Sequence, residues 1–169
     1  MGVDRAQTAA GGNGRVEVQW LMNNSPEKIN VKRLLEWLAA LIGAVNCIIV
    51  PGAFFQSGQT DFPFPFLYFV EIALLGVLVI GFVAARPRLG TRWNAIPWVA
   101  AGILLAFVIL GGFSIGFFLI PAFLAFTIVG LLVDAQTNGS ISKHVGLLFV
   151  AAVAQGALMV LMLSISSNF

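Results

Sequence analysis

The sequence contains few charged residues. Lys, Arg, Asp and Glu together make up 9% of its 169 residues, whereas soluble domains carry about 25%. Hydrophobic residues make up 59% of the chain. This composition excludes an ordinary water-soluble domain, and the length leaves room for one compact helical bundle without a second globular domain.

Residues that commonly carry chemistry are also scarce. Cys47 is the only cysteine and His144 the only histidine, which excludes an internal disulfide and argues against a transition-metal site. Nucleotide-binding, hydrolase and zinc-protease motifs are absent from the sequence. We therefore predict no catalytic residues, no metal ligands, no cofactor, no enzymatic activity and no nucleic-acid partner.

Long uncharged runs take the place of these residues. Residues 96–133 contain no Asp, Glu, Lys, Arg, His, Asn or Gln. At about 1.5 Å per residue, one helix of that length would far exceed the roughly 30 Å hydrocarbon core of a bilayer. The run therefore predicts two membrane-crossing helices that turn back on each other at residues 111–114.

The remaining runs complete an all-α, polytopic membrane bundle. We predict residues 1–24 as a flexible polar tail and residues 25–169 as a single transmembrane domain. Its five helices are expected at residues 34–55, 63–85, 93–110, 115–133 and 143–164, with a turn-rich loop at 134–140. The alternative is a four-helix bundle in which residues 96–133 cross the membrane once.

Basic residues predict the orientation of these helices, because Lys and Arg concentrate in cytoplasmic loops. With five helices, all nine Lys and Arg residues fall on one side, whereas four helices would separate Lys143 from the other eight. We predict a cytoplasmic N-terminus and an external C-terminus. Trp37, Trp93 and Trp98 are expected near the cytoplasmic interface, which favours amphipathic rings.

Glu71 is the sharpest candidate for function, because it lies inside the second predicted helix. A carboxylate in a membrane helix costs roughly 2.5 kcal/mol or more. Asn46 and Gln155 fall near the middle of the first and fifth helices, so all three side chains could meet in an intramembrane polar site. Two readings stay open: a proton, cation or ligand site, or hydrogen bonds that pack helices together.

Charged residues near the helix ends have simpler interpretations. We predict a basic rim at the inner surface, which orients the protein and faces anionic lipid. Its members are Lys32, Arg33, Arg86, Arg88 and Arg92. Lys32 could pair with Glu36 one helical turn away. We interpret His144 as an interfacial residue.

Two prolines fall inside predicted helices. Pro121 lies in the fourth helix and Pro51 near the far end of the first. Because proline removes a backbone hydrogen bond, each predicts a helix kink.

These observations predict a small multi-pass membrane protein, in the cytoplasmic membrane of a prokaryote. We expect a non-catalytic subunit or accessory protein that acts through helix–helix and lipid contacts, with a membrane-protein partner or a second copy of itself. The alternative is a small transporter or a proton or ion conductor that uses Glu71.

Overall fold

The computed structural model describes residues 31–56, 63–112, 115–137 and 139–166. The chain divides into two units, residues 1–31 and 32–169. Apart from Val31, the helices described below belong to the second unit. The predicted tail at residues 1–24 lies outside the described residues.

Helices account for 94% of the described residues, and none of these residues is in a strand. The five long helices are α2 (Val31–Gln56), α3 (Pro63–Ala85), α4 (Ile96–Leu110), α5 (Gly116–Thr137) and α6 (Ile141–Ser166). Two short 3₁₀ helices, η1 (Arg86–Arg88) and η2 (Thr91–Ala95), connect α3 to α4. Five helical segments of the described chain are long and apolar enough to cross a membrane. The run at residues 96–133 contributes to two helices, α4 and α5, so the predicted number of helices is confirmed.

Several helix boundaries differ from those predicted, by one to four residues, and two of them concern the segments that join the helices. The helix expected to begin at residue 93 starts instead with the 3₁₀ turn η2, and regular α-helix begins at Ile96. The helix expected to end at residue 133 continues to Thr137, so half of the predicted loop at 134–140 is helical. The Thr137 hydroxyl donates to the Val133 carbonyl at 2.9 Å, and the Gly139 amide donates to the Asp134 carbonyl at 3.1 Å. These bonds satisfy polar groups at the end of α5, so the helix extends past its apolar run.

Pro51 and Pro121 lie inside α2 and α5, respectively. Each helix therefore continues through its proline, and the kinks expected at these positions stay predictions.

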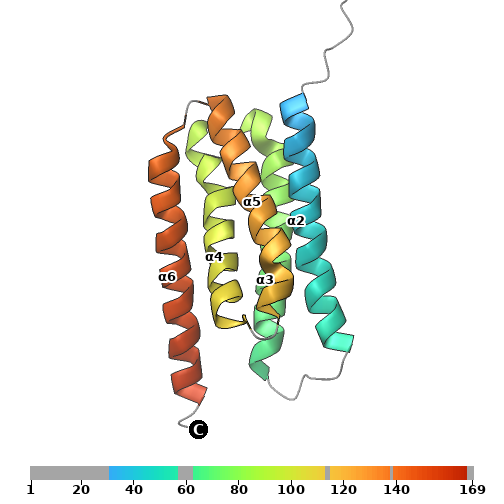
Figure 1. Cartoon of the computed structure of the whole chain (residues 1–169), viewed down its shortest axis with the longest axis vertical. Coiled ribbons are helices and arrows are strands. Elements are labelled where there is room, and N and C mark those ends of the chain that lie inside the picture. The colour runs from blue at the N-terminus through green and yellow to red at the C-terminus, as the bar shows by residue number, and fades with distance from the viewer. Residues whose placement is uncertain (1–30, 57–62, 113–114, 138, 167–169) are drawn as a thin grey trace, which may run out of the picture. The chain divides into compact units, whose positions relative to one another are not determined.

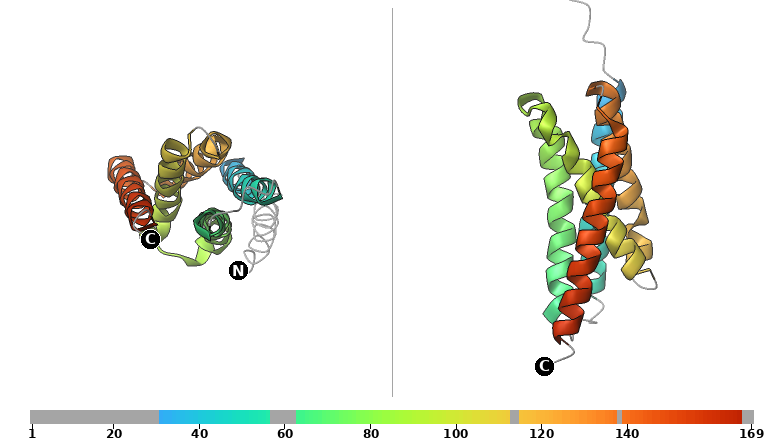
Figure 2. Two further views of the ribbon diagram at one scale, coloured as in Figure 1. Left: turned by 90° about the horizontal axis from the view of Figure 1, so that it is seen from below. Right: turned by 90° about the vertical axis from the view of Figure 1, so that its left-hand side faces the viewer.

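Helix α4 lies between α5 and α6 and packs closely against both (Figure 1). The end-on view in Figure 2 shows α2, α3, α4 and α5 around a shared interior, with α6 outside them against α4. Small residues bring neighbouring helices together. Gly43 of α2 faces the ring of Phe126 in α5, and Gly76 of α3 faces the backbone of Ala44 in α2.

The interior and the outer surface of the bundle are both apolar. Fully buried side chains in the core include Trp98, Phe126, Ile72 and Leu104. Large hydrophobic side chains also cover the outside, and α6 carries several of them: Phe149, Val150, Val153, Leu161 and Leu163. Such extensive exposed apolar surface is unfavourable in water and suits contact with lipid or another membrane protein.

Gly102 permits the close contact between α4 and α6. A Cβ atom at this position would lie 2.3 Å from the Leu148 carbonyl oxygen and 2.9 Å from the Ala151 Cβ. Because the nearest atom belongs to the backbone, a larger side chain requires the two helices to separate.

Gly102→Ala is therefore expected to destabilise the protein by about 1–3 kcal/mol, the typical cost of overpacking. Thermal unfolding in detergent provides the measurement. Gly81→Ala is the matched control, because a Cβ atom there meets no atom within 4 Å. This control should be neutral or stabilising by up to about 1 kcal/mol, since alanine favours helix over glycine. Equal stability of both variants would contradict the close contact.

Candidate functional site

Polar side chains gather at one end of the bundle. At this end α2, α4 and α6 begin and α3 and α5 end (Figure 1). We call it the basic end, because it holds the six described Lys and Arg residues: Lys32, Arg33, Arg86, Arg88, Arg92 and Lys143. Two buried carboxylates also lie there, and each has a partner on another helix.

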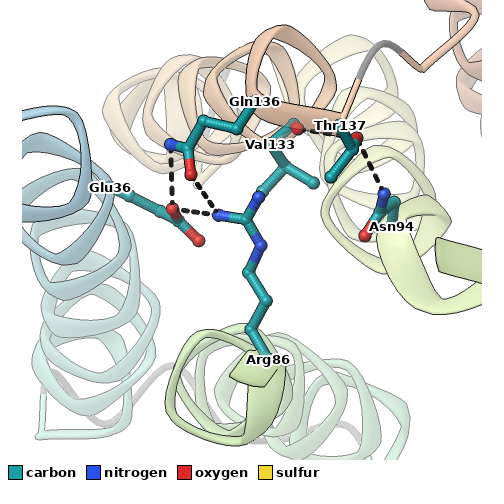
Figure 3. A network of polar contacts seen from close by, with 6 residues as sticks. All are labelled: Glu36, Arg86, Asn94, Val133, Gln136 and Thr137. Carbon is teal, nitrogen blue, oxygen red and sulfur yellow. Dashed lines mark hydrogen bonds and ion pairs between the residues drawn. The ribbon is translucent and has the colours of Figure 1, made fainter. Parts of the chain in front are cut away.

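Glu36 of α2 is the first of these acids and is only 1% exposed. Figure 3 shows Arg86 of η1 donating through Nη1 to Glu36 Oε2 and, at 3.0 Å, to Gln136 Oε1 of α5. Gln136 Nε2 in turn donates to Glu36 Oε2 at 3.3 Å. The three residues form an ion pair bridged by an amide, and they connect α2, the end of α3, and α5.

Arg86 takes the role that the sequence suggested for Lys32. The predicted Lys32–Glu36 pair is wrong, because the Glu36 carboxylate turns into the bundle while Lys32 is exposed. A contact between residues fifty positions apart replaces the expected contact within one helix turn.

A second contact at the same end joins η2 to α5. Asn94 is buried, and its Nδ2 donates to Thr137 Oγ1 at 3.0 Å (Figure 3). The Thr137 hydroxyl in turn donates a hydrogen bond to the Val133 carbonyl. This pair holds the start of α4 beside the end of α5.

Asp134 is the second buried carboxylate, at 1% exposure. Its Oδ2 lies 2.8 Å from His144 Nδ1, which joins α5 to α6. The His144 ring stacks against Trp98 of α4, with ring centroids 6.4 Å apart and planes at 26°. Gly130 allows this packing, because a Cβ atom there would lie 2.8 Å from the Trp98 indole.

This cluster gives two residues contacts that the sequence did not indicate. Trp98, expected near the membrane interface, is 2% exposed and belongs to the core. His144, interpreted as an interfacial residue, pairs with a buried acid. Trp37 and Trp93 are exposed, as an interfacial position requires.

Three buried polar atoms at the basic end have no hydrogen-bond partner among the described residues. They are the acceptors Glu36 Oε1 and Asp134 Oδ1 and the donor Trp98 Nε1. Buried polar groups are normally satisfied by protein or by ordered water. The basic end therefore contains two acceptors and one donor whose hydrogen bonds its internal contacts do not supply.

The predicted intramembrane site is brought together only in part. Gln155 Nε2 of α6 donates to Glu71 Oε2 of α3 at 3.0 Å. Gln155 is buried and Glu71 half-buried. The Asn46 Oδ1 atom is buried without a hydrogen-bond partner in the described part of the chain, so Asn46 lies outside this pair.

The basic rim also differs from the expected set. Lys32, Arg33, Arg88 and Arg92 are exposed, whereas Arg86 is drawn between helices by Glu36 and Gln136. Lys143 is exposed as well. Arg86 thus contributes to the interior of the basic end rather than to its surface.

Sequence reasoning missed most of the polar contacts at the basic end. Glu36, Asn94, Asp134 and Gln136 lie just inside or just beyond apolar runs, where a polar residue normally faces water or headgroups. The missed signal was the combination of an acid at one helix end with a cation or histidine at the start or end of a neighbouring helix. Only the packing of the helices selects the partner.

Comparison with known proteins adds no relative. No protein-family model matches the chain, and neither the curated proteins nor the solved structures include a match. Within the described residues, no three His, Cys, Asp or Glu side chains are grouped so that they could hold a metal ion.

The Glu36–Arg86 pair leads to a test of stability. Arg86→Gln leaves the buried Glu36 without a counter-charge, so we expect a loss of about 3 kcal/mol in detergent. Glu36→Gln combined with Arg86→Gln should recover part of this loss, because no buried charge is then left unpaired. Arg88→Gln is the control for removing one arginine from the same segment, and it should change stability by less than about 0.5 kcal/mol. Equal effects of Arg86→Gln and Arg88→Gln would refute the ion pair.

The Glu71–Gln155 contact leads to a test of its role. Glu71→Gln keeps an oxygen that can accept the bond from Gln155, so stability should stay close to that of the original chain. Glu71→Ala removes the acceptor and should cost about 0.6–1.7 kcal/mol, the range for hydrogen bonds between membrane helices. Proton flux in proteoliposomes provides the second readout. Loss of a measurable flux in Glu71→Gln would contradict a purely packing role.

Proposed function

We propose that this chain is a small multi-pass membrane protein with a non-catalytic role, as a subunit or accessory protein acting through helix–helix and lipid contacts. Its five apolar helices are compatible with such a protein. One observation carries the proposal: each Asp and Glu side chain of the described residues, buried or half-buried, makes a contact with another helix.

Each of those acids bonds to a different helix. Glu36 bonds to Arg86, Asp134 to His144, and Glu71 to Gln155. A carboxylate that serves as a general acid, a metal ligand or a cation site must offer an oxygen that the substrate or ion can reach. The second oxygens of Glu36 and Asp134 have no partner among the described residues, but both are enclosed by the protein. Partner-bound acids at helix junctions instead support a packing role.

The outer surface supports the second half of the proposal. Exposed apolar side chains on α2, α3 and α6 offer a large area to lipid or to another membrane protein. We further propose that the basic end faces the cytoplasm of a prokaryotic cell, in line with the cytoplasmic preference of Lys and Arg. A cysteine introduced at Arg88 should then resist a membrane-impermeant thiol reagent until the cells are opened.

Transport through Glu71 is the second candidate. The half-buried position of Glu71 favours it, because a fully enclosed carboxylate could not exchange protons or ions with water. The bond to Gln155 favours packing, since it occupies one of the two carboxylate oxygens. We therefore place transport behind the subunit role.

Purification of the tagged full-length chain in mild detergent tests the proposal. We expect the chain to require detergent for extraction and to elute with a membrane protein in fixed stoichiometry, or as a defined homo-oligomer. The untagged chain, carried through the same purification, controls for non-specific binding. Recovery without detergent would refute the membrane role, and a monomer without partners that conducts protons would favour transport.

A further inference from the structure

Every exposed charged side chain in the described part of the chain is basic. The five are Lys32, Arg33, Arg88, Arg92 and Lys143. The described acids are Glu36, Glu71 and Asp134, and all three are buried or half-buried and bonded within the protein. The surface of the basic end therefore carries positive charge that the described acids do not offset there.

The connection between α3 and α4 holds two of these basic side chains together with an exposed tryptophan. Arg88 lies in η1, and Arg92 and Trp93 lie in η2. All three side chains are exposed, with Trp93 at 53%. Arg86 in the same connection is occupied by Glu36 and Gln136, so it leaves Arg88 and Arg92 as the available guanidinium groups.

The depth of this connection is set by the helices on either side. The apolar spans on either side are Phe66–Arg88 and Thr91–Leu110, so Arg88 ends one span and Arg92 lies at the start of the next. In a bilayer this is the level of the headgroups, and tryptophan also prefers that level. The two arginines thus lie where lipid phosphates would be.

The backbone keeps the two arginines close together. The Leu89 amide donates to the Arg86 carbonyl and the Trp93 amide to the Gly90 carbonyl, each at 3.1 Å, so the connection folds into two turns. Even fully extended, four residues span at most about 14 Å. Guanidinium groups form paired hydrogen bonds with phosphate oxygens.

We propose that Arg88, Arg92 and Trp93 form a binding site for the headgroup of an anionic phospholipid from the surrounding bilayer. The arginines bind the phosphate, and the indole ring packs beside the lipid at the interface. This inference rests on the proposed membrane location. An acidic protein would also meet the charge, but the position at the ends of two apolar spans favours lipid.

Native mass spectrometry of the full chain in detergent tests the site. The probe is an equimolar mixture of phosphatidylglycerol and phosphatidylcholine with identical acyl chains. We expect the original chain to retain phosphatidylglycerol in preference. Arg88→Gln combined with Arg92→Gln should weaken this binding about 25-fold, since each cation near an anionic lipid contributes roughly fivefold.

Two control variants make the result specific. Lys32→Gln combined with Arg33→Gln removes the same charge from another part of the basic end and should weaken binding far less. Arg88→Lys combined with Arg92→Lys keeps the charge and should retain most of the preference. All variants alter exposed side chains, and an unchanged thermal transition establishes that each is folded.

Three results would overturn the site: equal retention of both lipids by the original chain, an equal loss in the two glutamine double variants, or no loss in the Arg88 and Arg92 pair. The occupant would be an acidic protein and not a lipid if the original chain showed no lipid preference but carried a bound acidic protein that the Arg88→Gln and Arg92→Gln double variant had lost. In each of these results the chain still requires detergent, so the proposed membrane role would stand while the lipid site would fall. Recovery of the chain without detergent would instead refute the membrane role itself.

Discussion

A carboxylate enclosed by apolar helices needs a hydrogen-bond donor or a cation on another helix, and this constraint organises the basic end. Glu36 obtains Arg86 and Gln136, and Asp134 obtains His144. The contacts of Glu36 join segments that are fifty or more residues apart in the sequence, and the contact of Asp134 joins the consecutive helices α5 and α6. The cost of burying an acid is offset only when the helices are in register, so these contacts favour one arrangement of α2, α3, α5 and α6 over others.

Close approach of backbones is the second element of the architecture. In lipid the hydrophobic effect does not drive helices together, so their association depends on close packing and on interhelical hydrogen bonds. Gly102 allows α4 and α6 to touch, and Gly43 and Gly76 bring α2 against α5 and α3. Helix α6 is held both by close backbone packing and by hydrogen bonds. Its backbone packs against Gly102 of α4, and its His144 and Gln155 side chains bond to α5 and α3.

The same distribution of charge links the interior to the surface. Because Glu36 and Asp134 are turned inward, the exposed charges of the described residues at the basic end are all positive. The interior contacts thereby determine what the protein offers to its surroundings. A bundle with an apolar outer surface and a positive end is suited to lipid and partner contacts, which is the basis of the proposed role.

The sequence alone determined the helical class and the number of helices, because uncharged runs such as residues 96–133 can satisfy their backbone only as helices that turn back on themselves. Positions within the predicted helices also indicated Glu71, Asn46 and Gln155 as groups at similar depth, and of these Glu71 and Gln155 are paired in the structure. Which partners the charged residues choose was decided only by the tertiary structure. The sequence indicated Lys32 as the partner of Glu36 and placed Arg86 in the basic rim, and Trp98 is as amphipathic as Trp93. The faces that the packed helices turn toward each other place Arg86 and Trp98 inside and leave Lys32 and Trp93 exposed.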